Sequence, residues 1–448
     1  MSSTASIPLA PGCVPVLGHA PALLHNPLAF LASLPGHGDL LRIRAGTGTV
    51  VMVCDPVLTR QVLADDRTFD KGGPVLNRAR EMAGDGLGTC PHERHRRLRR
   101  LCQPSFRHDR FPAYAAAVTA SVDATARSWH DGQIIDPRPE THGAMARAAV
   151  ETLVGNTLPP RVVQQAADDL TALNAGILRG AVTPPLFKRI PTPGNRRFQH
   201  ARTHLQRTFG DIITARRADG TDHGDLLSSL LQAVIPEAAH DSRVLTDDEL
   251  VDQLLTFFFS GTETTADTLS WALHLLARHP EIADRLHSEA DSLPAGTSLL
   301  PTSLPALQET GRVVRETLRL YPPAWLTTRT VTKDSELGGH SIPAGTALAL
   351  SPYLIHHRPD LYREPDRFVP DRWRTVKPDR TTYIPFGSGA RTCIAEHFAL
   401  GDITLALTAF TTRWRLTPAT KRPVRTRAFA TLRPRGLLRV IAREKACR

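Results

Sequence analysis

The stretch Phe386-Gly-Ser-Gly389-Ala-Arg391-Thr-Cys393-Ile-Ala395 carries the most specific chemistry in this sequence of 448 residues. Its two glycines permit a tight loop that another group can approach closely. Arg391 and the start of a helix predicted near Cys393 place positive potential beside the thiol, which lowers the pKa of a cysteine and favours the thiolate. Ligation of haem iron by cysteine requires such a thiolate. The alternative is a buried cysteine that packs as a small hydrophobic residue beside a turn.

The same stretch resembles the haem-binding loop of the cytochrome P450 family, whose pattern is Phe-x-x-Gly-x-Arg-x-Cys-x-Gly. Phe386, Gly389, Arg391 and Cys393 match the pattern, and Ala395 stands where the family usually has glycine. The resemblance implies that Cys393 is the axial ligand of the iron and that the other three matching residues bind the cofactor, haem b (iron protoporphyrin IX). We expect the methyl group of Ala395 to alter the fit slightly without loss of the ligand.

An arginine-rich segment near residue 95 allows three interpretations. Its arginines could bind nucleic acid, or Cys90, His92, His95 and Cys102 could hold zinc, although their spacing fits no usual zinc finger. In the family, a His/Trp-x-x-x-Arg pair at this place binds a haem propionate, and His95 and Arg99 match it. Arg329 and Arg391 match two further propionate contacts. Charge-assisted bonds between arginine and carboxylate are strong and often bidentate.

A long central helix is predicted from 247 to 279, where the capping box Thr246-Asp-Asp-Glu249 precedes an apolar run and Pro280 follows it. In its middle, Ser260-Gly-Thr-Glu-Thr-Thr265 predicts a local kink, because hydroxyl groups bond back to the carbonyl four residues earlier. A water-filled polar seam in a helical core is the alternative. By resemblance, Glu263 and Thr264 match the acid–alcohol pair with which the family delivers protons to bound dioxygen.

Glu316 and Arg319 lie three residues apart, so they share one face of a predicted helix. The plain interpretation is a surface ion pair that contributes little to stability. In the family such a pair binds a later arginine in a buried network behind the haem. By resemblance Arg372 is that third member, and the nearby Arg367 is not part of the network. Glu316, Arg319 and Arg372 are expected to have a structural role.

The remaining pattern predicts a mainly α fold with a small β region, in one domain that spans residues 1–448. The resemblance implies the P450 fold, with the haem between the long central helix and the Cys393 loop. The other predicted helices cover 56–65, most of 110–235, 305–320 and a final segment that starts near 393, and an exposed Pro-rich connection is expected at 183–194. Predicted strands are 40–45, 49–54, 327–331, 341–342, 346–350 and 437–442.

Composition and charge narrow the class of protein. No run of about 18 apolar residues is present and the N-terminus does not resemble a secretory signal, so we expect a cytoplasmic protein without a membrane anchor. The six cysteines are spaced too irregularly for a disulfide framework. The net charge of +11 (55 − 44) suits nucleic acid or an acidic protein partner. Because haem explains the arginines better, we expect no nucleic-acid partner.

The resemblance implies a haem-thiolate monooxygenase that uses dioxygen and two external electrons to oxidise a C–H bond of an apolar small molecule. Ferredoxin and ferredoxin reductase are the expected electron donors, and a monomer is expected. The sequence is most similar to actinobacterial members of the family that oxidise sesquiterpenes in secondary (antibiotic or terpenoid) metabolism, so a pentalenene-like cyclic sesquiterpene is the predicted substrate. A polyketide, steroid or fatty acid is the alternative substrate, and a peroxygenase or a non-catalytic haem-binding or sensing protein is the alternative function.

Overall fold

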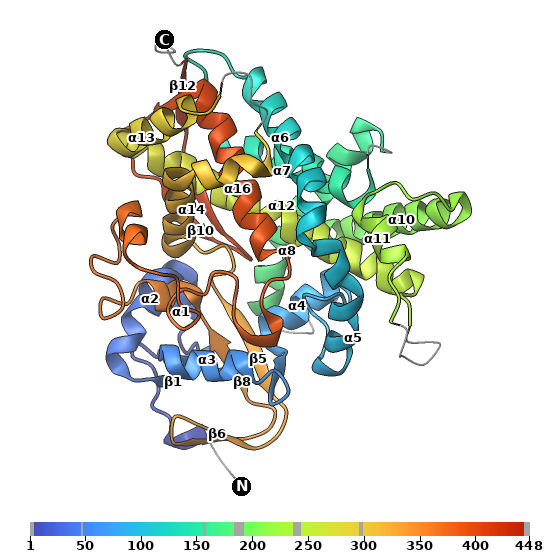
Figure 1. Cartoon of the computed structure of the whole chain (residues 1–448). Helices are drawn as coiled ribbons and strands as arrows, with labels where there is room; N and C mark the ends of the chain where they lie inside the picture. The colour runs from blue at the N-terminus through green and yellow to red at the C-terminus, as the bar shows by residue number, and fades with distance from the viewer. Residues whose placement is uncertain are drawn as a thin grey trace.

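A computed structural model describes residues 4–45, 48–155, 158–182, 192–235, 243–294 and 299–442. Helices fill the upper and right parts of the view in Figure 1, and the largest sheet lies at the lower left. The prediction of a mainly α fold with a small β region is confirmed. No helix within these described ranges is long and apolar enough to cross a membrane.

Most of the described chain lies in α-helices. The longer ones are α3 (Pro56–Ala64), α4 (Gly73–Ala83), α5 (His92–Cys102), α6 (Phe111–Ser128), α7 (Pro137–Val154), α8 (Pro160–Val182), α10 (Pro193–Asp219), α12 (Asp247–Arg278), α13 (Pro280–Asp291), α14 (Gln308–Leu320) and α16 (Glu396–Arg413). Shorter ones are α1 (Ala20–His25), α2 (Pro27–Ser33), α11 (Leu226–Leu231) and α15 (Pro352–His356). Proline often occupies the first turn of these helices, where its missing N–H costs no hydrogen bond.

The central helix α12 begins and ends where the sequence predicts. Thr246 and Glu249 form the capping box, and the helix is continuous over 32 residues to Arg278. It packs against α7, α10, α14, α16, β9 and β11. Because so many elements contact it, α12 fixes the positions of the segments that come together around its middle.

The strands form one larger sheet and three small ones. The five-stranded sheet has the order β1-β2-β8-β5-β3, and the predicted hairpin of β1 and β2 is antiparallel, with Leu40 opposite Val53. The strands of this sheet are β1 (Leu40–Ala45), β2 (Gly48–Val53), β3 (Phe69–Lys71), β5 (Thr327–Val331) and β8 (Ala347–Leu350). The small sheets contain β4 (Ile134–Ile135), β6 (Ser335–Leu337), β7 (His340–Ile342), β9 (Trp414–Pro418), β10 (Arg425–Ala428), β11 (Leu432–Arg435) and β12 (Leu438–Ala442).

Some predicted boundaries are wrong. The helix expected over 305–320 is a 3-10 turn, Pro301–Ala306, followed by α14 from Gln308. Proline disfavours the α conformation in the residue before it, and Pro305 lies inside the turn. The last long helix begins at Glu396, because residues 389–391 form a separate 3-10 turn. Of the predicted Pro-rich connection, residues 183–191 lie outside the described residues, and α10 already includes residues 193 and 194.

Glu316 is the centre of a fully buried network between α14 and the irregular segment that follows α15. Arg319 donates to both of its oxygens, at 2.9 and 3.0 Å, and Arg372 Nε donates to Oε1 at 3.0 Å. The Trp373 indole and the Val369 backbone N–H add two more donors, each at 3.0 Å. Glu316 and Arg319 are 0% exposed, and the one carboxylate pairs with both guanidinium groups, so the buried anion is fully compensated.

The same network reaches the chain that leads into the Cys393 loop. Arg319 also donates to three backbone carbonyls, and its own carbonyl lies 3.1 Å from His356 Nδ1. His356 Nε2 in turn accepts the Ile384 backbone N–H at 2.9 Å. Arg367 instead forms an ion pair with Glu364 at the surface. The structure therefore joins the side chains of Glu316, Arg319 and Arg372, whereas Arg367 contributes only its backbone carbonyl.

Candidate functional site

The loop of Cys393 depends on glycine at one position for space as well as for backbone conformation. The Cys393 N–H donates to the Phe386 carbonyl at 3.0 Å and closes the loop. Gly389 has φ +72°, and a Cβ atom there would lie 2.2 Å from the carbonyl oxygen of Leu63. A side chain at this position would push the loop away from α3. The signature glycine thus brings Cys393 close to the N-terminal part of the chain.

Ala395 is accommodated because its position does not require glycine. Its φ is −101°, and it is the residue that immediately precedes α16. Its backbone N–H hydrogen-bonds to the thiol of Cys393. The departure from the family pattern therefore keeps the hydrogen bond that the backbone gives to the sulfur.

The side chain of Cys393 is exposed, unlike those of Cys54, Cys90 and Cys102, which are buried. Protein atoms on its other sides still desolvate the thiol, and this burial raises its pKa, while the Ala395 N–H and Arg99 lower it only in part. The prediction of a lowered thiol pKa is wrong for the chain alone, because desolvation outweighs the positive potential of the loop. A metal ion bound to the sulfur would supply the missing positive charge.

Three cations near this thiol have no carboxylate partner among the residues the structure describes. Arg99 donates to the Thr392 carbonyl at 2.7 Å, Arg329 to the Thr328 carbonyl at 3.0 Å, and Lys71 to the Gly88 carbonyl. Lys71 on β3 pairs with Arg329 on β5, so two cations are direct neighbours. Burial, Arg329 and Arg391 lower the pKa of Lys71 to about 7. Cations that repel one another beside an accessible thiol fit a cofactor that carries both iron and carboxylates.

Arg391 is held differently from these three cations. Its guanidinium contacts Asp66 at 2.7 Å and Asp70 at 3.0 Å, and it donates to the Cys90 carbonyl at 2.9 Å. Two carboxylates already compensate its charge, so its contact with a propionate stays a prediction. His95 is buried, 3.9 Å from Asp66, and burial together with Arg391 lowers its pKa to about 3. The neutral imidazole can donate one N–H to a carboxylate.

The zinc interpretation of the arginine-rich segment is wrong. Cys90 Sγ lies 3.7 Å from Arg391, and Cys102 Sγ lies 3.8 Å from the Gln253 amide. Over the described ranges, no three or more His, Cys, Asp or Glu side chains are arranged to hold a metal ion. The arginines of α5 also serve the fold, since Arg94 and Arg97 both bind Glu249.

The predicted acid–alcohol pair is divided between two sides of α12. Ser260 and Gly261 are exposed in the middle of the helix, and the Thr264 hydroxyl donates to the Ser260 carbonyl at 2.5 Å. Glu263 is 0% exposed and faces α7 and β11 instead. Hydroxyl bonding to carbonyls four residues earlier occurs as predicted, and α12 remains a continuous helix through this segment.

Glu263 is an ionised carboxylate in a cluster of buried charges. Arg138 and Arg433 each donate to Oε2 at 2.9 Å, and His142 Nε2 lies 3.0 Å from Oε1. Burial alone would raise the pKa of Glu263, but His142 and the two arginines outweigh it and lower the pKa. Burial raises the pKa of Asp267, one turn later on α12, to about 6.

Sequence reasoning missed several residues of the site. Lys71 and the two aspartates that hold Arg391 come from the segment before α4, and Asp70-Lys71-Gly-Gly73 was the only local signal. The partners of Glu263 come from α7 and β11, more than 100 residues away from it, and no spacing rule connects them. For Asp267 a local signal exists, because its position at i+4 from Glu263 places both residues on one face of the helix.

A family model described as "Cytochrome P450" matches residues 8–440. The chain belongs to the cytochrome P450 family. This P450 is 42% identical to the pentalenene oxygenase of Streptomyces avermitilis over 439 residues, 97% of each chain. It is 41% identical to the cyclooctat-9-en-7-ol 5-monooxygenase of Streptomyces melanosporofaciens over 413 residues, 91% of this chain and 89% of the relative. The crystal structure of the cytochrome P450DA heme domain superposes with TM-score 0.85 at 25% identity, with 98% of both chains covered.

Membership fixes the general chemistry. The protein is a P450 monooxygenase with a haem-thiolate cofactor, and it uses a small-molecule substrate, dioxygen and a redox partner. The accessible thiol and the uncompensated cations fit that cofactor, whose two propionates are anionic.

The substitutions Gly389→Ala and Gly387→Ala test whether the loop needs space or only backbone freedom. Both glycines have positive φ, +72° and +71°, so either alanine costs about 1–2 kcal/mol of backbone strain. The methyl at 389 also meets Leu63, whereas nothing lies within 4 Å of the methyl at 387. We expect Gly389→Ala to lower the free energy of unfolding by a further ~1–3 kcal/mol, measured by urea unfolding. Equal losses in both variants would contradict the steric account.

Proposed function

We propose that this P450 binds haem b through Cys393 and oxidises a C–H bond of a cyclic sesquiterpene. The observation that carries the proposal is the accessible Cys393 thiol beside three cations that lack carboxylate partners. When bound, the thiolate-ligated haem supplies the activation of dioxygen that the oxidation of an unactivated C–H bond requires. The protein supplies the ligand, the orientation of the cofactor and the delivery of protons.

Each element of the site has a role in this proposal. Arg99, Arg329 and Lys71 would hold the propionates as charge-assisted donors, and neutral His95 would donate one hydrogen bond. Arg391 holds the loop to Asp66 and Asp70 and adds positive potential at the same edge of the cofactor. Phe386 and Gly389 shape the loop that presents the sulfur.

Proton delivery is assigned to Glu263 and Thr264. Thr264 is the partly accessible hydroxyl in the exposed middle of α12, where it can hold a water molecule or a polar oxygen atom. Glu263 lies behind it and exchanges protons with the side of the molecule where Arg138 is 15% exposed. An acid and an alcohol on adjacent residues can pass a proton from the side of α12 that faces α7 and β11 to the side where Thr264 is partly accessible.

The substrate proposal rests on the relatives. The two Streptomyces enzymes are named for pentalenene and cyclooctat-9-en-7-ol, both cyclic terpenoids. Identity above 40% over nearly the whole chain favours a substrate of the same chemical class. Fold and shared motifs do not fix a substrate by themselves, so binding must be measured.

The absorption spectrum of the reduced carbon monoxide complex tests the cofactor and its ligand. The wild-type holoenzyme should show the strongly red-shifted Soret band of thiolate ligation, and Cys393→Ser should lose it because a hydroxyl is a poor thiolate substitute. Arg329→Gln should keep the band but release haem to apomyoglobin faster, since one propionate contact is lost. A histidine-type band in the wild type, or an unchanged band in Cys393→Ser, would refute the assignment.

Spectral titration of the ferric holoenzyme tests the substrate. We expect saturable shifts of the Soret band with pentalenene, and weaker ones with pentadecanoic acid, which has the same number of carbon atoms. The reason is that a rigid ring system loses less conformational entropy on binding than a flexible chain does. Tighter binding of the fatty acid, of a steroid or of a polyketide would select one of those alternatives. Binding of these ligands without any turnover would favour the alternative of a non-catalytic haem-binding or sensing protein.

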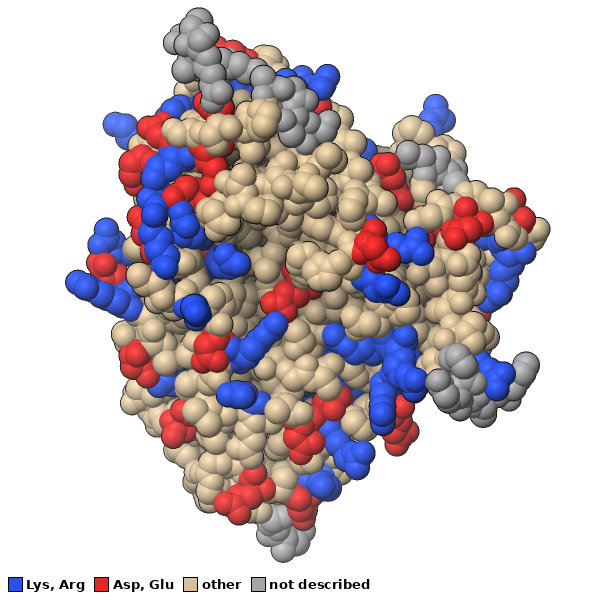
Figure 2. Space-filling model, in the orientation of Figure 1, with Lys and Arg blue, Asp and Glu red and all other residues tan. Residues whose placement is uncertain are grey.

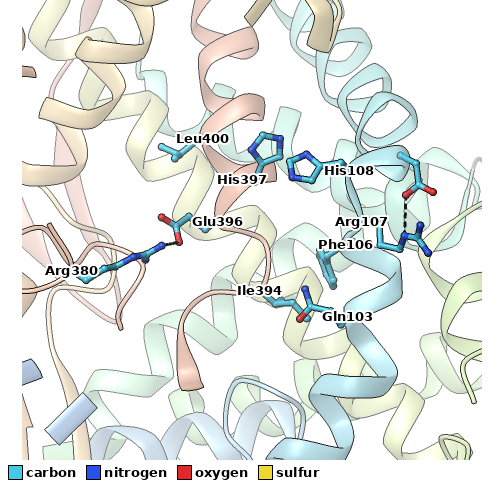
Figure 3. Close-up of a pocket in the computed structure, with 10 residues that line it drawn as sticks. Gln103, Phe106, Arg107, His108, Arg380, Ile394, Glu396, His397 and Leu400 are labelled. Atoms are coloured by element: carbon cyan, nitrogen blue, oxygen red, sulfur yellow. Dashed lines mark hydrogen bonds and ion pairs between the residues drawn. The ribbon is translucent and has the colours of Figure 1, made fainter. Parts of the chain in front are cut away.

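We also propose that an acidic ferredoxin, reduced by a ferredoxin reductase, docks on the face next to the Cys393 loop of a monomer. A hollow of about 840 Å³ lies there, with Ile394, His397 and Leu400 on one wall and Phe106 and His108 on another. Figure 3 shows His108 and His397 side by side, with ring centroids 4.2 Å apart. Figure 2 shows Lys and Arg side chains gathered over α5 on the same face. Within the hollow, Arg107 pairs with Asp109 and Arg380 with Glu396. The positive charge that suits a negatively charged electron donor is therefore that of the neighbouring α5.

Neutralising exposed arginines at this hollow tests the docking proposal. Arg107→Gln and Arg380→Gln should each raise the KM for a plant-type ferredoxin by roughly two- to fivefold at low salt, with kcat at saturating ferredoxin unchanged. Arg439→Gln, on β12 at the top of Figure 1 and not among the residues that line the hollow, is the control. Salt should reduce the difference between variants and wild type. An equal effect in all three variants, or turnover driven only by hydrogen peroxide, would refute the ferredoxin proposal.

A further inference from the structure

Two carboxylates lie one turn apart on the buried side of α12. Glu263 and Asp267 are both 0% exposed. A buried carboxylate is costly unless cations and hydrogen bonds compensate it. The compensating groups come from two other elements, Arg138 and His142 from α7 and Arg433 from β11.

Both arginines are shared between both carboxylates. Arg138 lies 2.9 Å from Glu263 and 3.1 Å from Asp267. Arg433 lies 2.9 Å from Glu263 and 3.7 Å from Asp267. Asp267 Oδ1 accepts from Arg138 Nε at 3.1 Å, whereas Oδ2 has no hydrogen-bond partner within the described part of the chain. His142 contacts only Glu263 of the two acids.

The charges of the two arginines are balanced only while both Glu263 and Asp267 are present as carboxylates. Two carboxylates face two guanidinium groups, and arginine does not lose its proton in proteins. When Glu263 takes up a proton, Asp267 remains as the single anion for both arginines. Without Asp267, protonation of Glu263 would leave two buried cations with no anion at all, which is strongly unfavourable.

We propose that Asp267 is a positioning residue that keeps Arg138 and Arg433 compensated while Glu263 accepts and releases a proton. The inference rests on the proposed role of Glu263 in proton delivery. In one cycle, an O–H bond forms on Glu263 with a proton from water on the Arg138 side. The same bond then breaks as the proton moves toward Thr264. No electron is transferred, and the cluster returns to its starting charge.

The ratio of oxidised product to hydrogen peroxide during turnover tests the proposed role of Asp267 in proton delivery. With ferredoxin, its reductase and pentalenene, Asp267→Asn should lower the ratio of product to hydrogen peroxide by about tenfold, a part of the roughly 10²–10⁴-fold that a positioned acid or base contributes. The solvent deuterium isotope effect on kcat should rise, and the dissociation constant for pentalenene should stay unchanged. A purely structural role would change the dissociation constant and leave the isotope effect as it is.

A charge-balanced double variant controls for damage to the fold. Asp267→Asn combined with Arg433→Gln leaves one carboxylate and one guanidinium, so Glu263 no longer has to hold two cations. We expect the double variant to recover most of the product-to-peroxide ratio that Asp267→Asn loses. Loss in the double variant equal to or greater than that in the single variant would overturn the proposal.

Infrared titration of the carboxyl band tests the coupling without turnover. The band of protonated Asp267 is the one that disappears in Asp267→Asn. Removing the charge of Glu263 by Glu263→Gln should move its midpoint down by about one pH unit or more, because both arginines then act on Asp267 alone. Coupling is reciprocal, so this shift equals the effect of Asp267 on Glu263. An unchanged midpoint would overturn the inference.

The roles of Glu263 and Asp267 can be tested separately. If Glu263→Gln does not uncouple turnover, the proposed function of Glu263 is wrong, although the infrared shift would still be observed. If Glu263→Gln uncouples turnover and Asp267→Asn does not, only the role of Asp267 is wrong.

Discussion

The position of Cys393 depends on a carboxylate that never contacts the cofactor site. Glu316 accepts five hydrogen bonds from two arginines, an indole and a backbone N–H. Arg319 then ties the network to backbone carbonyls, and His356 ties it to Ile384, just before the Cys393 loop. Because these groups are buried, each lost contact leaves a charge or a donor without compensation. The irregular segment before the loop therefore has one favourable arrangement, although it contains little secondary structure.

The balance of charge distinguishes the parts of the molecule that are complete from the part that needs a ligand. Around Glu263 the two carboxylates and two guanidinium groups cancel, and Arg391 is cancelled by Asp66 and Asp70. Lys71, Arg99 and Arg329, in contrast, donate only to carbonyl and hydroxyl oxygens within the described residues. A group of cations that lack carboxylate partners, next to an exposed thiol, is stabilised when an anionic group joins it. The haem of the family carries two anionic propionates and would supply this negative charge.

Local signals in the sequence predicted what local forces determine. The capping box at Thr246, the hairpin of β1 and β2, and the pairing of Glu316 with Arg319 each depend on residues within a few positions of one another. The raised pKa of the Cys393 thiol could not be predicted, because it depends on desolvation by distant segments. The partners of Glu263 were equally out of reach, since α7, α12 and β11 meet only in the folded chain. The division of Glu263 and Thr264 between two sides of α12 follows from the same packing.

The largest sheet also affects how the chain folds during synthesis. β2 ends at Val53, and its parallel neighbour β8 begins at Ala347, 347 − 53 = 294 residues later. At the usual 5–20 residues per second, the ribosome needs roughly 15–60 s to produce the second strand after the first. During that time the apolar edge of β2, with Val51 and Val53, has no partner. The N-terminal hairpin therefore waits for the C-terminal third of the chain, and chaperones have that interval in which to cover its edge.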